Sequence, residues 1–201
     1  MTFEKRVLDI SLALVLILVL AVPFALLVIY LLLREGRPVF YVSERMRSPT
    51  RGFLLWKLRT MSVTSGDSGV SGGDKASRVT PVGKMLRKFR ADEIPQLWNV
   101  LKGDMSFVGP RPPLRQYVER FPEIYGKVLQ SRPGITGMAT LYFHRHEEHL
   151  LSKCLTAEMT DDVYARCCVP RKARLDLIYA RQQNLCLDIA LMLKTVRKVA
   201  N

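Results

Sequence analysis

The chain has 201 residues, which is enough for one folded domain with a hydrophobic core but leaves little room for a second. It carries 31 Lys and Arg against 18 Asp and Glu, for a formal net charge of +13. This charge favours polyanionic partners, so nucleic acid, anionic lipid and phosphorylated substrates all fit. The four cysteines form no CxxC pair, and adjacent Cys167 and Cys168 are poorly placed for a disulfide framework or a zinc site. We therefore expect reduced thiols in one globular unit with an anchor.

The anchor is an apolar segment from Ile10 to Leu33, 24 residues without a charge. As a straight helix it would reach about 36 Å, enough for a bilayer core of about 30 Å. Pro23 removes the helical hydrogen bond to the carbonyl of Val19 and predicts a kink. Two geometries follow, a kinked span or a re-entrant hairpin that enters and leaves on one face. Because backbone breaks in lipid are costly, physical reasoning alone favours the kinked span.

The next segments predict a hairpin followed by a loop. Residues 39–42 and 53–59 are short β-type runs separated by a turn near residues 48–52. Residues 62–77 contain five serines and four glycines with almost no apolar content, which predicts a surface loop. Such a loop acts either as an active-site lid or as a passive linker.

Residues 92–103 contain residue types that are typical of the start and the end of a helix. Asp92 is the predicted N-cap, Lys102 lies in the last turn and Gly103 fits the position after the helix. A carboxylate at a helix N-terminus meets free N–H groups, so we expect Asp92 to be ionised near neutral pH. Four apolar residues share one face of this helix and are predicted to pack in the core: Ile94, Leu97, Trp98 and Leu101.

Asp92 and Glu93 form an acid pair in the most basic part of the chain. The surrounding cations are Lys84, Arg87, Lys88, Arg90, Arg111 and Arg115. Cations crowded around two acids suit a phosphate-handling site, where the acids supply reactivity or hold a metal. Three prolines around Arg111 stiffen its segment, and the turn at 132–137 has glycines suited to close approach of the backbone to a ligand.

Two further patterns each have two interpretations. Residues 171–199 alternate basic and apolar positions at helical spacing, which predicts a core helix or one on the membrane surface, with the core slightly favoured. His144, His146 and His149, with Glu147 and Glu148 between them, are residue types that bind transition metals. Their spacing is not a standard metal motif, and a polar helix face explains it as well.

The block from Asp92 to Pro112, DEIPQLWNVLKGDMSFVGPRP, closely resembles the bacterial sugar transferase family. These are monotopic phosphoglycosyl transferases that start glycan assembly on a polyprenol phosphate carrier. Further matching features occur in the family's order, so the resemblance covers nearly the whole chain: Lys5, Arg6 and Asp9, Pro23, residues 57–61, Arg87 and residues 133–137.

The resemblance implies a mixed α/β, mainly helical fold at the cytosolic face of a bacterial inner membrane. Residues 1–36 would form a re-entrant membrane helix broken at Pro23, which replaces the preference for a span. Residues 37–201 would form the catalytic domain, with a short hairpin and interfacial amphipathic helices. The family often has a serine before that proline, whereas this chain has Val22.

The resemblance also implies a reaction that needs Mg²⁺. Asp92 would attack the sugar-bearing phosphate of a nucleoside diphosphate sugar, expected to be a UDP-sugar, and would also contact the metal. Polyprenol phosphate would then accept the phosphosugar, with Glu93 assisting proton or metal handling. The phosphate-binding candidates are Arg87 and Arg111, with Lys57 and Arg59 as weaker ones.

The expected partners are thus the sugar nucleotide, polyprenol phosphate and membrane lipid, without nucleic acid, in glycan or exopolysaccharide assembly. Residues 138–146 depart from the family's pattern, so the identity of the sugar does not follow from the resemblance. The alternative is a membrane-anchored basic module that binds nucleic acid or anionic lipid without catalysis. It explains the positive charge but not the ordered acid pair.

Overall fold

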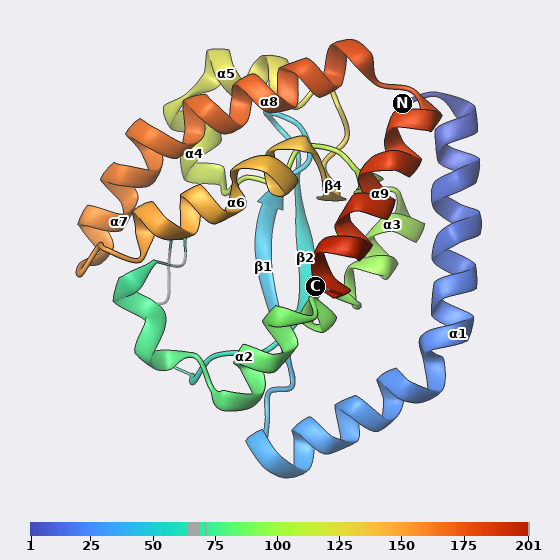
Figure 1. Ribbon diagram of the computed structural model, residues 1–201, viewed down its shortest axis with the longest axis vertical. Helices are drawn as coiled ribbons and strands as arrows, with labels where there is room; N and C mark the ends of the chain where they lie inside the picture. Colours follow the sequence, from blue (N-terminus) through green and yellow to red (C-terminus); the bar gives the residue numbers. More distant parts are fainter. Residues whose placement is uncertain (64–68, 71, 201) are drawn as a thin grey trace.

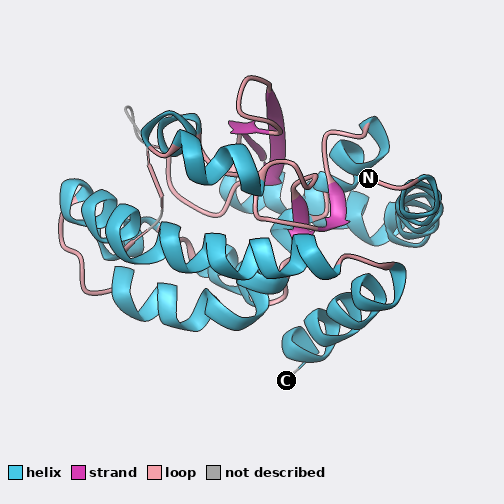
Figure 2. Cartoon of the chain, turned by 90° about the horizontal axis from the view of Figure 1, so that it is seen from above, coloured by secondary structure: helices cyan, strands magenta, loops and turns pink. Residues whose placement is uncertain are grey.

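The computed structural model describes residues 1–63, 69, 70 and 72–200 and has the mixed, mainly helical architecture predicted from the sequence (Figure 1). A long N-terminal helix, α1, runs along one side of a domain built from shorter helices and two small sheets. Figure 2 shows the same domain from above, with α1 and the C-terminal helix at its edge.

Helix α1 extends from Phe3 to Glu35, with Pro23 inside it. By length and composition it could cross a membrane, since its apolar stretch has a mean hydropathy of 3.3. Figure 1 shows α1 bending sharply part-way along its length. A bend is expected because Pro23 lacks the N–H that would continue the helical hydrogen bonds.

Both ends of α1 are attached to the same domain. At its start, Lys5 Nζ lies 2.5 Å from Asp188 Oδ2 in the C-terminal helix. At its end, the Arg59 guanidinium donates to the carbonyl oxygens of Glu35 and Gly36, at 2.7 and 3.0 Å. The same domain therefore holds both ends of the bent helix.

The predicted hairpin is present. Strands β1 (Phe40–Met46) and β2 (Gly52–Leu58) pair antiparallel, with Val42 opposite Trp56. Phe53 and Leu55 of β2 are buried in the cluster that also receives the first half of α1, whereas Leu58 packs with Leu31 from its second half. The hairpin thus joins the two halves of α1 to the domain.

Helix α3 (Gln96–Lys102) ends as predicted, with Gly103 in the left-handed conformation at φ 82°. Its predicted core face is only partly correct. Leu97 and Val100 are buried, and Ile94 and Leu101 pack partly buried against the same cluster. Trp98 is 57% exposed, so the prediction that it lies in the core is wrong. The buried face is centred on Leu97 and Val100, and Trp98 lies about 100° around the helix from Leu97.

A second sheet pairs residues that sequence reasoning did not connect. Strands β3 (Ser106–Val108) and β4 (Gly134–Thr136) run parallel. A Cβ on Gly134 would lie 2.6 Å from the backbone carbon of Val108, and Gly137 packs equally closely on the backbone of Gly109. The turn at 132–137 was predicted to let backbone approach a ligand. Its glycines instead allow two backbone segments of the protein to touch.

The segment after the hairpin is not a loop throughout. A 3-10 helix, η1 (Gly73–Arg78), lies in the chain between Met61 and Val79, which form an isolated antiparallel bridge. Asp74 in η1 accepts a hydrogen bond from Thr160 Oγ1 at 2.9 Å. The loop prediction, made for residues 62–77, is therefore wrong for residues 73–77, which belong to η1. Residues 64–68 and 71 of the predicted loop, and of the predicted lid, lie outside the described residues.

The remaining helices complete the domain. They are α2 (Pro81–Lys88), α4 (Arg115–Arg120), α5 (Pro122–Val128), α6 (Met138–Leu151), α7 (Ala157–Val163), a π-turn (Tyr164–Cys168), α8 (Val169–Gln182) and α9 (Leu185–Ala200). Side chains from α4, α5, α6, the π-turn and α8 pack around buried Tyr117 and Phe143. In Figure 1, α6 and α8 lie beside each other above the hairpin.

The C-terminal segment, predicted as one helix, is two. Asn184 ends the pattern because its side chain caps α9 by accepting from Leu187 N–H at 2.8 Å. Leu191 of α9 is buried, but Leu193 and Val196 are 56% and 66% exposed. The helix therefore has the core face that one of the two interpretations predicted, and it also has an exposed apolar face.

Candidate active site

Asp92 and Glu93 lie in a short 3-10 turn, η2 (Ala91–Glu93), between α2 and α3. The turn begins at Arg90, which has left-handed backbone with φ 54°. This conformation costs a non-glycine residue about 1–2 kcal/mol, and such strain is concentrated at functional sites. The N-cap position of α3 is Pro95, so the prediction that Asp92 caps this helix is wrong. The 3-10 turn separates Asp92 from the helix that it was predicted to cap.

Glu93 is surrounded by three cations. Its carboxylate accepts from Lys57 Nζ at 3.0 Å, Arg90 at 2.5 Å and Arg111 at 2.9 Å. Burial opposes ionisation, but the charges of Lys57, Arg111 and Arg90 together hold the pKa of Glu93 well below its usual value. Glu93 is therefore a fixed anion that keeps three basic side chains at the site.

Asp92 has a different environment. Its side chain is nearly buried, and among the described residues none forms a hydrogen bond or ion pair with its carboxylate. Burial raises the pKa of Asp92 above its usual value, as does the neighbouring charge of Glu93, while Lys57, Arg111 and Arg87 oppose the shift. An N-cap position would instead have lowered the pKa of this carboxyl. The result is a carboxylate without a structural partner beside three cations.

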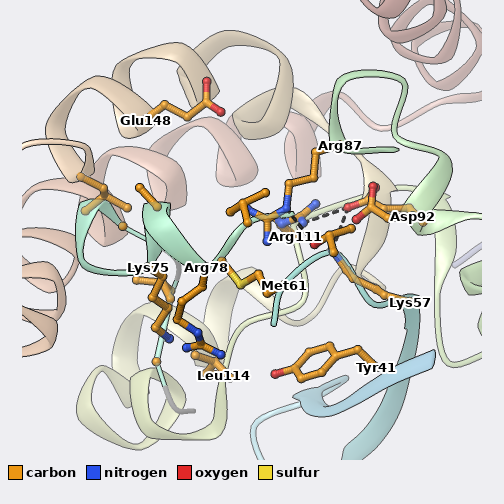
Figure 3. Close-up of a pocket in the computed structure, with 18 of the residues that line it drawn as sticks. Tyr41, Lys57, Met61, Lys75, Arg78, Arg87, Asp92, Arg111, Leu114 and Glu148 are labelled. Carbon is orange, nitrogen blue, oxygen red and sulfur yellow. Dashed lines mark hydrogen bonds and ion pairs between the residues drawn. The ribbon is translucent and has the colours of Figure 1, made fainter. Parts of the chain in front are cut away.

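Asp92 and Glu93 both line a cavity of about 880 Å³. Its volume lies within the range of about 300–1,000 Å³ that is typical of small-molecule sites. Figure 3 shows Arg87, Arg111 and Lys57 pointing into it around Asp92. All six site residues predicted from the sequence line this cavity: Lys57, Arg59, Arg87, Asp92, Glu93 and Arg111. The structure therefore brings together residues that are up to 54 positions apart in the chain.

The four basic candidates differ in how many of their nitrogen atoms are already bound by other protein groups. Arg111 is 38% exposed and has only Glu93 as a hydrogen-bonded partner among the described residues, so much of its guanidinium faces the cavity. Arg87 donates Nε to Thr60 Oγ1 at 2.9 Å, which leaves its other nitrogens available. Arg59 uses its guanidinium to hold the end of α1. Lys57, the other weaker candidate from the sequence, is held by Glu93 at 3.0 Å.

The opposite wall of the cavity contains residues that sequence reasoning did not select. Lys172 of α8 donates to Glu147 Oε1 of α6 at 2.9 Å and to Tyr164 Oη at 3.2 Å. Arg45, which the sequence did not indicate either, also lines the cavity. The spacing of Glu147 and Lys172 along the chain gave no signal, since only the packing of α6 on α8 makes them neighbours. Among the lining residues, basic side chains outnumber acidic ones, which favours an anionic ligand.

Several other candidates have structural partners. Arg115 lies outside the cavity lining and pairs with Glu44 at 2.6 Å on the surface. His144 lies 3.4 Å from Glu148, and His146 contacts Arg171, both on or beside α6. Among the described residues no cluster of three or more His, Cys, Asp or Glu side chains could hold a metal. The histidines therefore fit the polar helix face and not a transition-metal site.

A magnesium ion has different requirements. It is typically held by one or two carboxylates together with water and substrate phosphates. Asp92, an acid without a hydrogen-bonded partner in the described part of the chain, fits this role at the cavity wall. Glu93 fits less well, because its oxygens already accept from three cations.

The match to known proteins covers the entire chain. The model of the family described as bacterial sugar transferase matches residues 1–201. The chain belongs to this family. A UDP-N-acetylgalactosamine-undecaprenyl-phosphate N-acetylgalactosaminephosphotransferase of Aeromonas hydrophila is 35% identical over 98% of this chain. A UDP-glucose:undecaprenyl-phosphate glucose-1-phosphate transferase of Klebsiella pneumoniae is 34% identical over 91%.

Relatives in this family differ in length. The chain spans 44% of the Aeromonas protein and 37% of the Klebsiella protein. In contrast, it spans 86% of the sugar transferase EpsL of Bacillus subtilis, to which it is 32% identical. The similarity thus covers nearly all of this chain but less than half of the longer relatives.

Proposed function

We propose that the protein transfers a phosphosugar from a nucleoside diphosphate sugar, most plainly a UDP-sugar, to polyprenol phosphate. The observation that supports this most strongly is the unpartnered Asp92 carboxylate at the wall of a basic cavity. The names of the Aeromonas and Klebsiella relatives, which pair UDP-sugars with undecaprenyl phosphate, support the same substrates.

In the first step, an oxygen of Asp92 attacks the phosphorus that bears the sugar. The bond from this phosphorus to the oxygen of the nucleoside monophosphate breaks, and the nucleotide leaves with that oxygen. An aspartyl phosphosugar remains on the enzyme. Arg87, Arg111 and Lys57 offset the negative charge that otherwise repels a carboxylate from a diphosphate.

In the second step, an oxygen of polyprenol phosphate attacks the same phosphorus and Asp92 leaves as a carboxylate. The product is a polyprenol diphosphate sugar, which would start the assembly of a glycan or exopolysaccharide. Glu93 keeps Lys57 and Arg111 in place for both steps and is the second candidate for proton or metal handling. When Mg²⁺ is bound by Asp92 and the substrate phosphates, it supplies further neutralisation of the diphosphate.

The membrane geometry that we propose is re-entrant. The Lys5–Asp188 ion pair and the hydrogen bonds from Arg59 bind the two ends of α1 to one domain. A kinked span would place these ends on opposite faces of a bilayer core of about 30 Å. Residues 1–36 would then enter and leave on the cytosolic face of the inner membrane, with the catalytic domain at that face.

Release of nucleoside monophosphate tests the reaction. The protein in lipid nanodiscs, supplied with Mg²⁺ and polyprenol phosphate, is given a panel of sugar nucleotides that includes UDP-N-acetylgalactosamine and UDP-glucose. We expect one or a few donors to release UMP, and Asp92→Asn to abolish the release. Asp162→Asn is the matched control, since Asp162 pairs with Arg166 on the surface of α7. No release with any donor, or equal release by Asp92→Asn, would contradict the proposal.

A further inference from the structure

A second, smaller pocket adjoins the main cavity. It has a volume of about 120 Å³ and lies between α2, α6 and α9. This is well below the range of about 300 Å³ and above for drug-sized ligands, so it suits a single phosphate group and not a nucleotide. We call it the side pocket, and its lining is Arg87, Lys88, Arg90, Thr140, Leu141, His144, Thr195 and Lys198.

The side pocket is basic. Two arginines and two lysines line it. Arg90 pairs with Glu93 at 2.5 Å, His144 lies 3.4 Å from Glu148, and Lys198 donates to the carbonyl oxygen of Leu141 at 2.9 Å. Burial lowers the pKa of Lys198, as do the charges of Arg145 and Arg90, while Glu148 opposes the shift. Cations that repel one another around a small pocket are stabilised when an anion binds between them.

The side pocket communicates with the reaction site. Arg87, Arg90, Thr140 and His144 line both this pocket and the main cavity. The charge of Arg87 also acts on Asp92. The side chains of these four residues therefore form the wall between an anion in the side pocket and the main cavity.

Exposed apolar side chains flank the side pocket in sequence. Phe89 follows Lys88 and Val196 follows Thr195, and these two side chains are 54% and 66% exposed. A molecule with a phosphate at one end and a hydrocarbon chain at the other would use both the basic pocket and the apolar surroundings.

Helix α9 connects the side pocket to the membrane anchor. Its first turn carries Asp188, which is paired with Lys5 in the first turn of α1. The helix therefore starts where the anchor starts, and its uncovered residues Leu193 and Val196 form an apolar face between that point and Lys198. This arrangement suits a helix at the level of the lipid headgroups.

We propose that the side pocket binds the phosphate group of the lipid acceptor, with Lys88 and Lys198 as acceptor-binding residues. This inference rests on the proposed function and adds a separate entrance for the second substrate. The donor occupies the main cavity in the first step. The acceptor phosphate then reaches the phosphorus on Asp92 past Arg87, without passing through the space that the nucleotide used.

The test compares Lys198→Gln and Lys88→Gln with the wild-type protein in nanodiscs of zwitterionic lipid. The KM for polyprenol phosphate, measured at saturating donor, should rise about tenfold in each variant, as expected for loss of a charge-assisted contact to phosphate. The first step should be unchanged, which is measured as the rate of phosphosugar addition to the protein without acceptor. Lys194→Gln is the matched control. It removes a lysine one turn earlier on α9 that bonds to Tyr142 Oη and does not line the pocket.

Two additional arms identify the source of the phosphate. With a water-soluble short-chain isoprenyl phosphate, the same rise in KM is expected, because recognition of the headgroup does not need the bilayer. If the pocket instead holds a bulk phospholipid headgroup, added phosphatidylglycerol should inhibit the wild type but not Lys198→Gln, and the soluble acceptor should show no difference.

The outcomes separate the two proposals. Unchanged KM in both variants, equal loss in Lys194→Gln, or a slower first step in the variants would overturn the assignment of the side pocket while leaving the proposed reaction intact. Absence of any phosphosugar adduct on the wild type would instead overturn the covalent reaction, and the pocket's role with it.

Discussion

The charge cluster around Glu93 gives a quantitative prediction. Replacing Glu93 with Gln keeps the shape of the side chain but removes the anion that Lys57, Arg90 and Arg111 share. Breaking a buried ion pair from one side costs about 3–5 kcal/mol, because the remaining charge is left without compensation. Glu93 itself is 7% exposed, but its partners are 17%, 24% and 38% exposed, so water reduces the cost. We therefore expect the low end, about 3 kcal/mol at neutral pH.

Thermal unfolding in nanodiscs measures this loss. For a chain of this size, 1 kcal/mol corresponds to about 2–4 °C, so Glu93→Gln should lower the Tm by about 6–12 °C. The pKa of Glu93 is lowered on folding, so its contribution is complete above its unfolded-state pKa of about 4.3 and is lost as the pH falls through the folded value. The difference between Glu93→Gln and wild type should therefore shrink in acid.

A double-mutant cycle tests the reasoning directly. Lys57→Met alone should destabilise less than Glu93→Gln, since Glu93 retains two arginines. The double variant should lose less than the sum of the two single losses, by about 1 kcal/mol or more, because the residues share one interaction. Strict additivity, or a Tm for Glu93→Gln within 2 °C of wild type, where the structure predicts about 6 °C or more, would refute the idea that one carboxylate holds the cluster together.

Single substitutions at Asp92, in α3 and at the start of α1 have different expected effects. Asp92→Asn should be inactive yet at least as stable as wild type at pH 8. The pKa of Asp92 is raised on folding, so its negative charge opposes folding at this pH, and a lower Tm for the variant would contradict this. Leu97→Ala should cost about 2–5 kcal/mol in unfolding free energy, whereas Trp98→Ala should cost under about 1 kcal/mol in detergent, and a reversed order would contradict the packing of α3. Lys5→Met should destabilise by about 3–5 kcal/mol because it leaves Asp188 buried without its cation, and Lys5→Met combined with Asp188→Leu should recover much of that loss in the same unfolding assay.

Features that depend on neighbouring residues in the chain were predictable from the sequence. Gly103 ends α3 because only glycine adopts its left-handed conformation at low cost, and the hairpin follows from two short apolar runs around a turn. The acid pair within a basic segment also identified the cavity wall correctly. These inferences needed only neighbouring residues and simple backbone preferences.

Other features depend on contacts between distant segments. The N-cap argument failed because Arg90 enters the left-handed region and starts a separate 3-10 turn, which places Asp92 outside α3. The direction of its pKa shift depends on burial, which the sequence does not reveal. Likewise, Glu147 meets Lys172 only because α6 packs on α8, and the side pocket exists only where α2, α6 and α9 meet.

The central claim is that the carboxylate of Asp92 forms a covalent bond to the phosphorus of the donor. The direct measurement is intact mass after incubation with a competent sugar nucleotide and Mg²⁺ in the absence of lipid acceptor. We predict a single added phosphosugar that maps to Asp92, is absent from Asp92→Asn and disappears when polyprenol phosphate is added. An active enzyme whose mass never changes, or an adduct on another residue, would contradict the account.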